Sequence, residues 1–135
     1  MPDHAYRKAS IGDIELRERR GGGAGSRDIA GALGATEMTV RLWRFGPGDA
    51  MPYHRHRTQE ELYTLVSGGP QTIQVGAELV EVADGDWVRV PKDTPRRVMN
   101  STDRDAAWLI MGAPVGEGIM DGVRLDPESG EEIPR

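Results

Sequence analysis

Short stretches in which apolar and polar residues alternate, or in which apolar residues dominate, follow one another along most of this chain. Alternation puts every second side chain on one face of an extended strand, so each stretch predicts a strand with a buried face. Glycines and prolines lie between the stretches, where they end strands and form turns. Strands this short and this regularly spaced predict an all-β barrel or sandwich. The predicted strands are residues 11–19, 38–45, 61–67, 71–75, 78–82, 87–91, 96–100 and 107–113.

Two of these stretches also predict how the strands are arranged in the sheets. Residues 71–75 and 78–82 are separated only by Gly76 and Ala77, which predicts a hairpin with a two-residue loop. Residues 38–45 carry large apolar side chains on both faces, which indicates that both faces of this strand are partly buried. Those side chains are Met38, Val40 and Leu42 on one face and Trp43 and Phe45 on the other.

The two ends of the chain follow a different pattern. The glycine-rich residues 21–26 predict a flexible loop. After them, Ser26 is a candidate N-cap and Gly34 a candidate stop signal for one short helix. Residues 116–135 are rich in glycine, proline and acidic residues, and we expect an extended tail there. The chain is thus interpreted as a single domain with a barrel core at about 36–115, an N-terminal arm at 1–35 and the tail.

Composition restricts the partners and the metal chemistry that this chain can support. There is no cysteine, so a metal would have to be bound by nitrogen and oxygen ligands. The net charge of -5 argues against nucleic acid or an anionic membrane as the main partner. No apolar run approaches the roughly 20 residues of a membrane span. The N-terminus also lacks the apolar stretch of a signal peptide, so we expect a cytoplasmic protein.

Two of the three histidines, His54 and His56, are separated by one residue. On a strand, residues two apart point to the same face, so both imidazoles would project together. If residues 57–60 turn the chain, Glu61 opens the next strand and can face the same interior. Two imidazoles and a carboxylate suit Fe(II), and also Mn, Ni, Co or Zn, with positions left open for a ligand. A polar surface loop is the other interpretation, and the spacing alone does not separate the two.

The surrounding residues resemble the cupin family. The first cupin motif is matched by Gly48, His54, His56, Glu61 and Gly68, and the second in part by Gly85, Asp86, Pro91, Pro95 and Asn100. The resemblance implies an antiparallel jelly-roll barrel, or double-stranded β-helix, with a divalent transition metal in its interior. It also implies a homodimer, in which the N-terminal segment could add an edge strand to the partner.

The second motif departs from the family pattern at two positions. Asp93 stands in place of a glycine, and Arg96 stands in place of the histidine that is usually the fourth ligand. A guanidinium is always protonated and has no lone pair to give to a metal. Three interpretations stay open for Arg96. It could bind an anionic substrate beside an intact metal site, pair with Glu61 in a barrel that has lost its metal, or turn outward to pair with Asp93 or Asp105.

Several other side chains have both a functional and a purely structural interpretation. Tyr63 has the strand parity of Glu61 and could be a proton donor in the cavity, although a packed ring with a solvated hydroxyl is the simpler interpretation. Gln59 could orient a metal ligand or lie in a solvated loop. Asn100 is expected to support a turn or a backbone group. The large apolar residues expected in the core are Trp43, Trp87, Trp108, Met99 and Met111.

Together these features predict a metal-dependent enzyme that acts on a small molecule. His54, His56 and Glu61 would hold the metal, and Arg96 and Tyr63 are the candidate catalytic residues. The ligand set suits Fe(II), which favours dioxygenase-like chemistry, while isomerase and decarboxylase reactions also recur in the resembled family. The competing hypothesis is a non-catalytic barrel that binds or senses a small ligand, and Arg96 is the feature that favours it.

Overall fold

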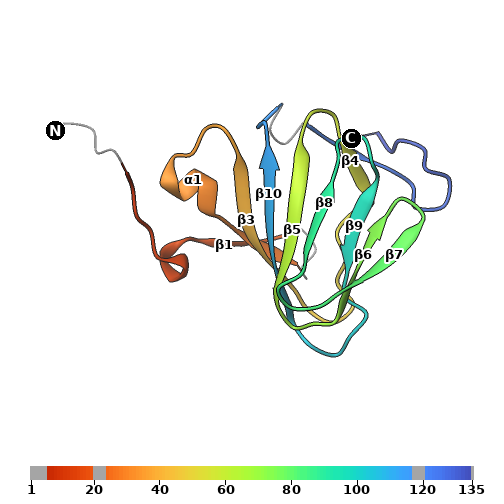
Figure 1. The fold of residues 1–135 in the computed structure, drawn as a ribbon, viewed down its shortest axis with the longest axis horizontal. Helices are drawn as coiled ribbons and strands as arrows, with labels where there is room; N and C mark the ends of the chain where they lie inside the picture. Colours follow the sequence, from red (N-terminus) through yellow and green to blue (C-terminus); the bar gives the residue numbers. More distant parts are fainter. Residues whose placement is uncertain (1–5, 20–23, 117–120, 135) are drawn as a thin grey trace.

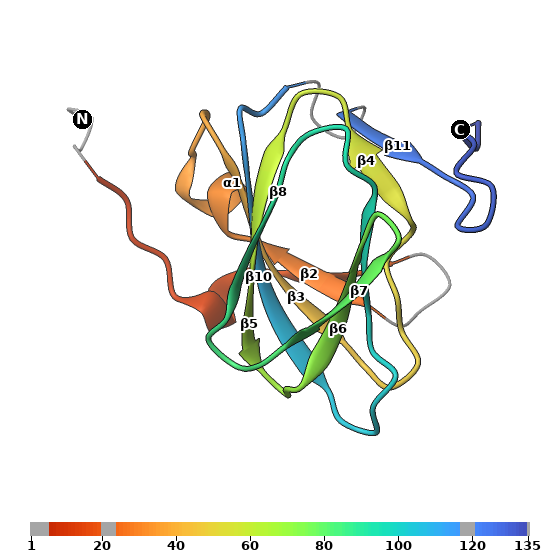
Figure 2. The same cartoon turned by 45° about the vertical axis from the view of Figure 1, so that its right-hand side comes forward.

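The computed structural model describes residues 6–19, 24–116 and 121–134, and its strands form two antiparallel sheets that face each other across a core (Figures 1 and 2). One sheet has the order β1 (Leu16–Glu18), β2 (Gly25–Asp28), β3 (Thr39–Phe45), β10 (Ala106–Ala113), β5 (Glu60–Ser67) and β8 (Trp87–Val90). The other has the order β11 (Gly122–Arg124), β4 (His54–His56), β9 (Arg96–Met99), β6 (Gln71–Val75) and β7 (Glu78–Val82). The predicted jelly-roll fold with one short helix is confirmed.

The predicted alternation is clearest in β10, which lies between β3 and β5. Its residues alternate between buried and half-buried positions, so that Trp108 faces the core opposite Trp43 and Leu65. Burial of such aromatic and aliphatic side chains is the main favourable contribution to folding. The fully buried apolar side chains of this core are Phe45, Leu65, Ile73, Val82, Val90, Val98 and Trp108.

Four of the large apolar residues expected in the core are less buried than predicted. Trp87 is 58% exposed because it lies on the outer face of the edge strand β8, so its assignment to the core was wrong. Trp43 is half-buried and packs against the core, and Met99 and Met111 are also half-buried. Only the tertiary arrangement distinguishes these positions, because an apolar residue on a strand is compatible with either face.

Two turns between strands require glycine because of their backbone conformation. Gly76 has a φ of 58°, and the predicted two-residue loop joins β6 to β7. Gly68 has a φ of 88°, and a Cβ atom there would lie 2.1 Å from the carbonyl oxygen of Asp105. Only glycine fits such a position, because both the backbone conformation and the close approach exclude a side chain.

The N-terminal arm differs from its prediction. Instead of one strand over residues 11–19, a short 3-10 turn at Ile11–Asp13 precedes β1. Residues 25–28, expected as loop and helix cap, form β2, which pairs with β3. The helix α1 (Ile29–Leu33) therefore begins after Asp28, whose carboxylate accepts from the backbone N–H of Gly31, rather than after Ser26. Gly34 ends it as predicted, with a φ of 72°.

The C-terminal segment contributes to the barrel. β11 pairs with β4, and Val123 and Leu125 pack with Tyr53 in a small apolar cluster. Figure 2 shows β11 lying along β4 at one end of the five-stranded sheet. The glycine-, proline- and acid-rich composition predicted an extended tail here, so this strand was not expected. Among the described residues, no helix has the length and apolar character needed to span a membrane.

Candidate metal centre

Three potential metal ligands converge between the two sheets. His54 and His56 both belong to β4 of the five-stranded sheet, and their rings lie edge to face with centroids 5.2 Å apart. Glu61 reaches them from β5 of the opposite sheet. One potential ligand atom from each residue lies within 4.8 Å of the other two. The predicted juxtaposition is therefore present, and the third histidine, His4, lies outside the described residues.

The hydrogen bonds of the two histidines determine which ring nitrogen is free. Nδ1 of His54 lies 2.7 Å from the carbonyl oxygen of Pro52, and Nδ1 of His56 lies 2.9 Å from Oδ2 of Asp121. A carbonyl and a carboxylate only accept, so Nδ1 carries the proton in both rings. In a neutral ring Nε2 is then the unprotonated nitrogen. Burial lowers the pKa of His54 to about 4, which keeps that ring neutral at pH 7.

Asp121 is a part of this site that the sequence analysis missed. Its side chain is fully buried and accepts hydrogen bonds from His56, from the backbone N–H of Thr58 at 3.0 Å and from that of Gln59 at 3.1 Å. The Thr58 hydroxyl donates to it as well. Burial by itself would raise the pKa of Asp121, but these hydrogen bonds outweigh it and lower the pKa. An ionised carboxylate behind a histidine orients the ring and strengthens Nε2 as a donor.

Arg96 points inward and contacts Glu61. It lies directly opposite His54 in the ladder between β9 and β4, and its side chain is fully buried. Nη1 donates to the carbonyl oxygens of Thr94 at 2.7 Å and Pro91 at 3.4 Å, while Nη2 lies 3.2 Å from Oε1 of Glu61. That approach is an ion pair without hydrogen-bond geometry, and Nε has no partner among the described residues. The interpretation in which Arg96 turns outward is therefore wrong.

The neighbouring departure from the motif, Asp93, has its own explanation. Its φ of 65° lies in the region that favours glycine, the residue usual at this position in the resembled motif. Its carboxylate pairs with Arg55 at 3.3 Å rather than with Arg96.

Glu61 is held by three contacts on one of its oxygens. Oε1 accepts from the Tyr63 hydroxyl at 2.8 Å and also lies near Arg96 and, at 3.3 Å, near Nε2 of His56. Burial alone would raise the pKa of Glu61, but His56, Arg96 and Tyr63 together lower it, so the carboxylate is ionised. None of the described residues forms a hydrogen bond to Oε2, which leaves this oxygen available as a ligand.

Tyr63 is fully buried, and burial raises the pKa of its hydroxyl well above the usual value. Its ring packs edge to face against Trp108, and its hydroxyl is bonded to Glu61 rather than to solvent. The interpretation of a solvated hydroxyl was thus wrong. Gln59 is likewise buried and donates to Thr39 and to the carbonyl of Val115, so it does not lie in a solvated loop. A catalytic role for Tyr63 or Arg96 stays a prediction.

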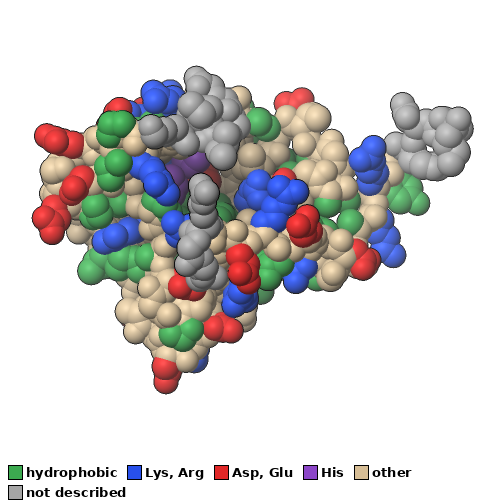
Figure 3. Space-filling view, turned by 180° about the vertical axis from the view of Figure 1, so that it is seen from behind, with side chains coloured by type: hydrophobic (Ala, Val, Ile, Leu, Met, Phe, Trp, Pro, Cys, Tyr) green, Lys and Arg blue, Asp and Glu red, His purple; other side chains and the backbone are tan. Residues whose placement is uncertain are grey.

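The ligands lie in a cavity of about 510 Å³ between the sheets. Figure 3 shows histidine side chains deep in a hollow with arginine or lysine side chains beside it. Neither Arg96 nor Tyr63 is among the described residues that line this cavity, although both contact Oε1 of Glu61. The described lining residues are Arg19, Ser26, Thr39, Arg41, Trp43, Met51, Pro52, His54, His56, Gln59, Glu61, Ile110, Gly122 and Arg124.

Asn100, a residue of the second motif, has the structural role that was predicted. Its amide donates to the carbonyl oxygens of Phe45 at 3.0 Å and Arg104 at 2.7 Å, and its oxygen accepts from Thr102. These bonds hold the loop between β9 and β10 at the far end of β3.

Comparison with known protein families identifies the fold family. A family model described as a cupin domain matches residues 41–112, which is more than half of the chain. The chain belongs to the cupin family. Cupins commonly bind divalent metals, and in this cupin His54, His56 and Glu61 form a possible metal site. A comparison with curated protein sequences gives no match.

Solved structures share the fold at low sequence identity. A sugar phosphate isomerase of the cupin superfamily from Silicibacter pomeroyi has a TM-score of 0.73 and 24% identity, over 79% of this chain and 75% of that one. A polyketide cyclase from Streptomyces resistomycificus has a TM-score of 0.69 and 17% identity, over 79% and 78%. Oxalate decarboxylase from Bacillus subtilis has a TM-score of 0.71 and 19% identity, over 91% of this chain but only 34% of that one. These identities support a common fold and do not select one activity.

Proposed function

We propose that this cupin is a metal-dependent enzyme that acts on a small molecule in the cavity between its sheets. The observation that carries the proposal is the direction of the histidine hydrogen bonds. Pro52 and Asp121 each hold an Nδ1 proton, which leaves both Nε2 atoms to face the carboxylate of Glu61. Nε2 of His56 lies 3.3 Å from a carboxylate oxygen of Glu61, and a cation bound between a ring nitrogen and a carboxylate would stabilise this arrangement.

The donor set fits a divalent transition metal. Two imidazoles and one ionised carboxylate match the nitrogen and oxygen ligands that Fe(II), Mn, Ni, Co and Zn accept. The bound metal would polarise an oxygen atom of the substrate or supply a position for O2. Since two histidines and a carboxylate suit Fe(II), we propose dioxygenase-like chemistry as the reaction class, with isomerisation or decarboxylation as the alternatives suggested by the names of its structural neighbours.

The remaining polar groups in this proposal act on Glu61. Tyr63 donates a hydrogen bond to Oε1 and orients the carboxylate of Glu61, and none of the described residues forms a hydrogen bond to Oε2, so this oxygen is also available to the metal. Arg96 holds Glu61 ionised and occupies the position of the histidine that is usually the fourth ligand. With three protein ligands, more coordination positions stay open to small molecules than with four.

The alternative function is a non-catalytic barrel that binds a small ligand. The ion pair between Arg96 and Glu61 is the observation that favours it, because a guanidinium 3.2 Å from the only carboxylate ligand competes with a metal for that charge. In this alternative His54 and His56 would contact the ligand directly.

Metal analysis separates the two functions. The protein is purified without a metal-affinity tag, and its metal content is measured beside that of His56→Ala. We expect near-stoichiometric transition metal in the parent and a clear loss in the variant. A parent free of metal, whose melting temperature does not respond to added Fe(II), Mn(II), Ni(II) or Zn(II), would refute the enzyme proposal.

We also propose that this cupin forms a homodimer through the outer face of its six-stranded sheet. Leu62, Val66 and Trp87 are 40%, 52% and 58% exposed on neighbouring strands β5 and β8. Exposed apolar residues that cluster in this way mark interaction surfaces. Sedimentation equilibrium of the parent and of Trp87→Lys tests this proposal, with a shift toward monomer expected in the variant.

A further inference from the structure

The charges around the cavity differ from those of the chain as a whole. The chain has a net charge of -5, yet the described residues that line the cavity include Arg19, Arg41 and Arg124 and only one carboxylate, Glu61. Burial of Arg96 beside Glu61 cancels even that charge locally. A divalent metal would add two more positive charges. Such an accumulation of positive charge in a concave site attracts anions.

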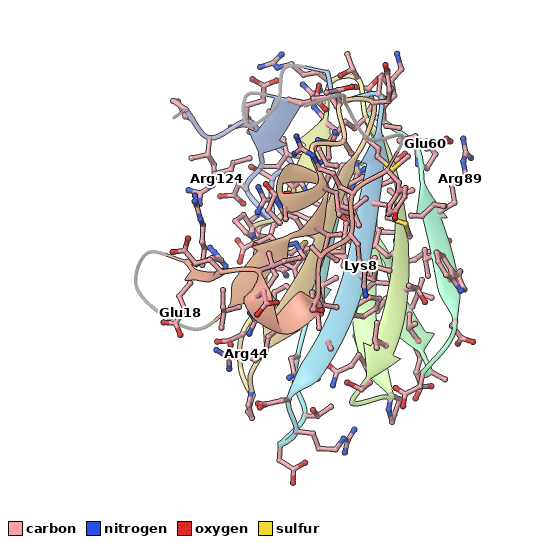
Figure 4. All side chains as sticks on the ribbon, turned by 90° about the vertical axis from the view of Figure 1, so that its left-hand side faces the viewer. Lys8, Glu18, Arg44, Glu60, Arg89 and Arg124 are labelled. Atoms are coloured by element: carbon pink, nitrogen blue, oxygen red, sulfur yellow. The ribbon has the colours of Figure 1, made fainter. Side chains whose placement is uncertain are left out.

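Two of these arginines have a direction set by strand register. Arg41 lies on β3 between Thr39 and Trp43, which share its parity and line the same cavity. Arg124 lies directly opposite His54 in the ladder between β11 and β4, so the two side chains project to the same face. Figure 4 shows Arg124 on the opposite side of the molecule from Glu60 and Arg89.

The guanidinium groups of these two residues have N–H donors that make no short hydrogen bond to the described residues. Arg41 makes only long contacts, to Ser26 at 3.3 Å and to Asp28 at 3.5 Å, and 40% of its side chain is exposed. Arg124 is exposed and has no side-chain partner among the described residues. Arg19 is more constrained, since Nη1 donates to the carbonyl of Ala50 at 2.7 Å. Arginine presents its donors in a planar fork that matches the oxygens of carboxylates and phosphates.

Arg96 is not part of this group. It is fully buried, it does not line the cavity, and its Nη1 is occupied by two carbonyl oxygens. Contact between Arg96 and a substrate would require displacement of Glu61. An anionic molecule in the cavity therefore meets Arg41 and Arg124, which come from strands of the two different sheets.

We propose that Arg41 and Arg124 bind the anionic group, a carboxylate or a phosphate ester, of a small organic substrate. Its apolar part packs against Trp43 and Ile110, and another of its oxygens reaches the metal. This assignment rests on the proposed function for its metal contact only, because anion binding by the two arginines does not require a metal. A lining that combines apolar side chains with arginines fits such an amphipathic anion.

The test measures binding by isothermal titration calorimetry to metal-free and Mn(II)-treated protein. The probes are phenylacetate, phenyl phosphate and the uncharged phenylacetamide. We expect at least one anion to bind about 10-fold or more tightly than phenylacetamide, because charge-assisted hydrogen bonds contribute at least this much. The anion that binds more tightly identifies the substrate group as carboxylate or phosphate.

Variants locate the binding site. Arg41→Gln and Arg124→Gln should each weaken binding of that anion about 10-fold. Arg41→Lys keeps the positive charge but loses the planar fork of donors. Its affinity for the anion should therefore lie between that of Arg41→Gln and that of the parent. Arg44→Gln is the matched control, since it lies on the same strand, is exposed and pairs with Glu18 rather than lining the cavity. Circular dichroism and melting temperature confirm that each variant folds.

The outcomes separate this inference from the proposed function. Anion binding that depends on Arg41 and Arg124 in a protein that takes up no metal would support the inference and refute the metal-dependent function. Folded Arg41→Gln and Arg124→Gln variants with the parent's affinity would overturn it, even if Mn(II) binds. Anions that bind no better than phenylacetamide would overturn it as well.

Discussion

Asp121 provides the sharpest test of the metal centre, because it acts on the ligands without being one. Asp121→Asn keeps the shape of the side chain and removes its charge. In the parent, Oδ1 accepts two hydrogen bonds from Thr58, and Oδ2 accepts one from Nδ1 of His56 and one from the backbone of Gln59. The hydroxyl of Thr58 can reverse and accept, whereas the other donors cannot. In the variant, the new amide NH2 should therefore face Thr58, and the amide oxygen should face His56.

The expected magnitude follows from these contacts. The backbone N–H of Thr58 loses its acceptor, and the bond to His56 loses its charge assistance, which costs about 2–3 kcal/mol of unfolding free energy. Loss of a ligand-orienting carboxylate typically weakens metal binding by about 10- to 100-fold. We expect about 10-fold for Asp121→Asn, which retains an acceptor, and a value near 100-fold for Asp121→Ala, which does not.

Chelator competition with Mn(II) or Zn(II) measures the metal affinity, and urea unfolding of the metal-free protein measures stability. Asp126→Asn is the matched control from the same C-terminal segment, since the carboxylate of Asp126 accepts from the backbone N–H groups of Glu128 and Ser129 and contacts none of the metal ligands. Metal affinity within about twofold of the parent in folded Asp121→Asn and Asp121→Ala would refute the role assigned to this carboxylate.

Two further predictions concern Arg96 and His54. Arg96→His replaces a guanidinium that faces Glu61 with a third nitrogen donor, and thus a fourth ligand, so metal affinity in the same chelator assay should rise by about 10-fold or more. An unchanged affinity would show that Arg96 does not influence the metal. His54 has a pKa of about 4 when folded, against 6.5 in the unfolded chain. Between these values the unfolded chain binds a proton that the folded protein does not. The unfolding free energy of the metal-free protein should therefore decrease by up to ~3 kcal/mol as the pH falls from about 6.5 to about 4. Urea titrations at several pH values measure this decrease, which should be smaller in His54→Asn.

Much of the fold could be predicted from local sequence. The alternation in residues 71–75 and 78–82 and the Gly76 turn were sufficient for the hairpin of β6 and β7, because register follows from loop length. The parity of His54 and His56 predicted that the two rings project together. The predicted turn at residues 57–60 was also sufficient to place Glu61 near the two histidines.

Other elements could not be predicted because their partners are remote in sequence. β2 contains Gly25 and Ser26, which locally favour a loop, and it is a strand because it pairs with Arg41–Arg44 of β3. β11 is a three-residue strand that exists through its pairing with β4, and the only signal for it was the weak alternation of Gly122, Val123 and Arg124. Short strands of this kind are stabilised by their neighbours rather than by intrinsic propensity.

By itself the sequence determined the all-β architecture, the convergence of two imidazoles and the absence of thiolate ligands. These follow from strand periodicity and from residue chemistry, both of which act over a few residues. Tertiary structure alone decided that Arg96 points inward against Glu61, that Asp121 orients His56 across 65 positions of the chain, and that Arg41 and Arg124 face the same cavity. The physical reason is that these contacts depend on how strands pair and sheets stack, and this arrangement minimises the free energy of the whole chain rather than of any segment.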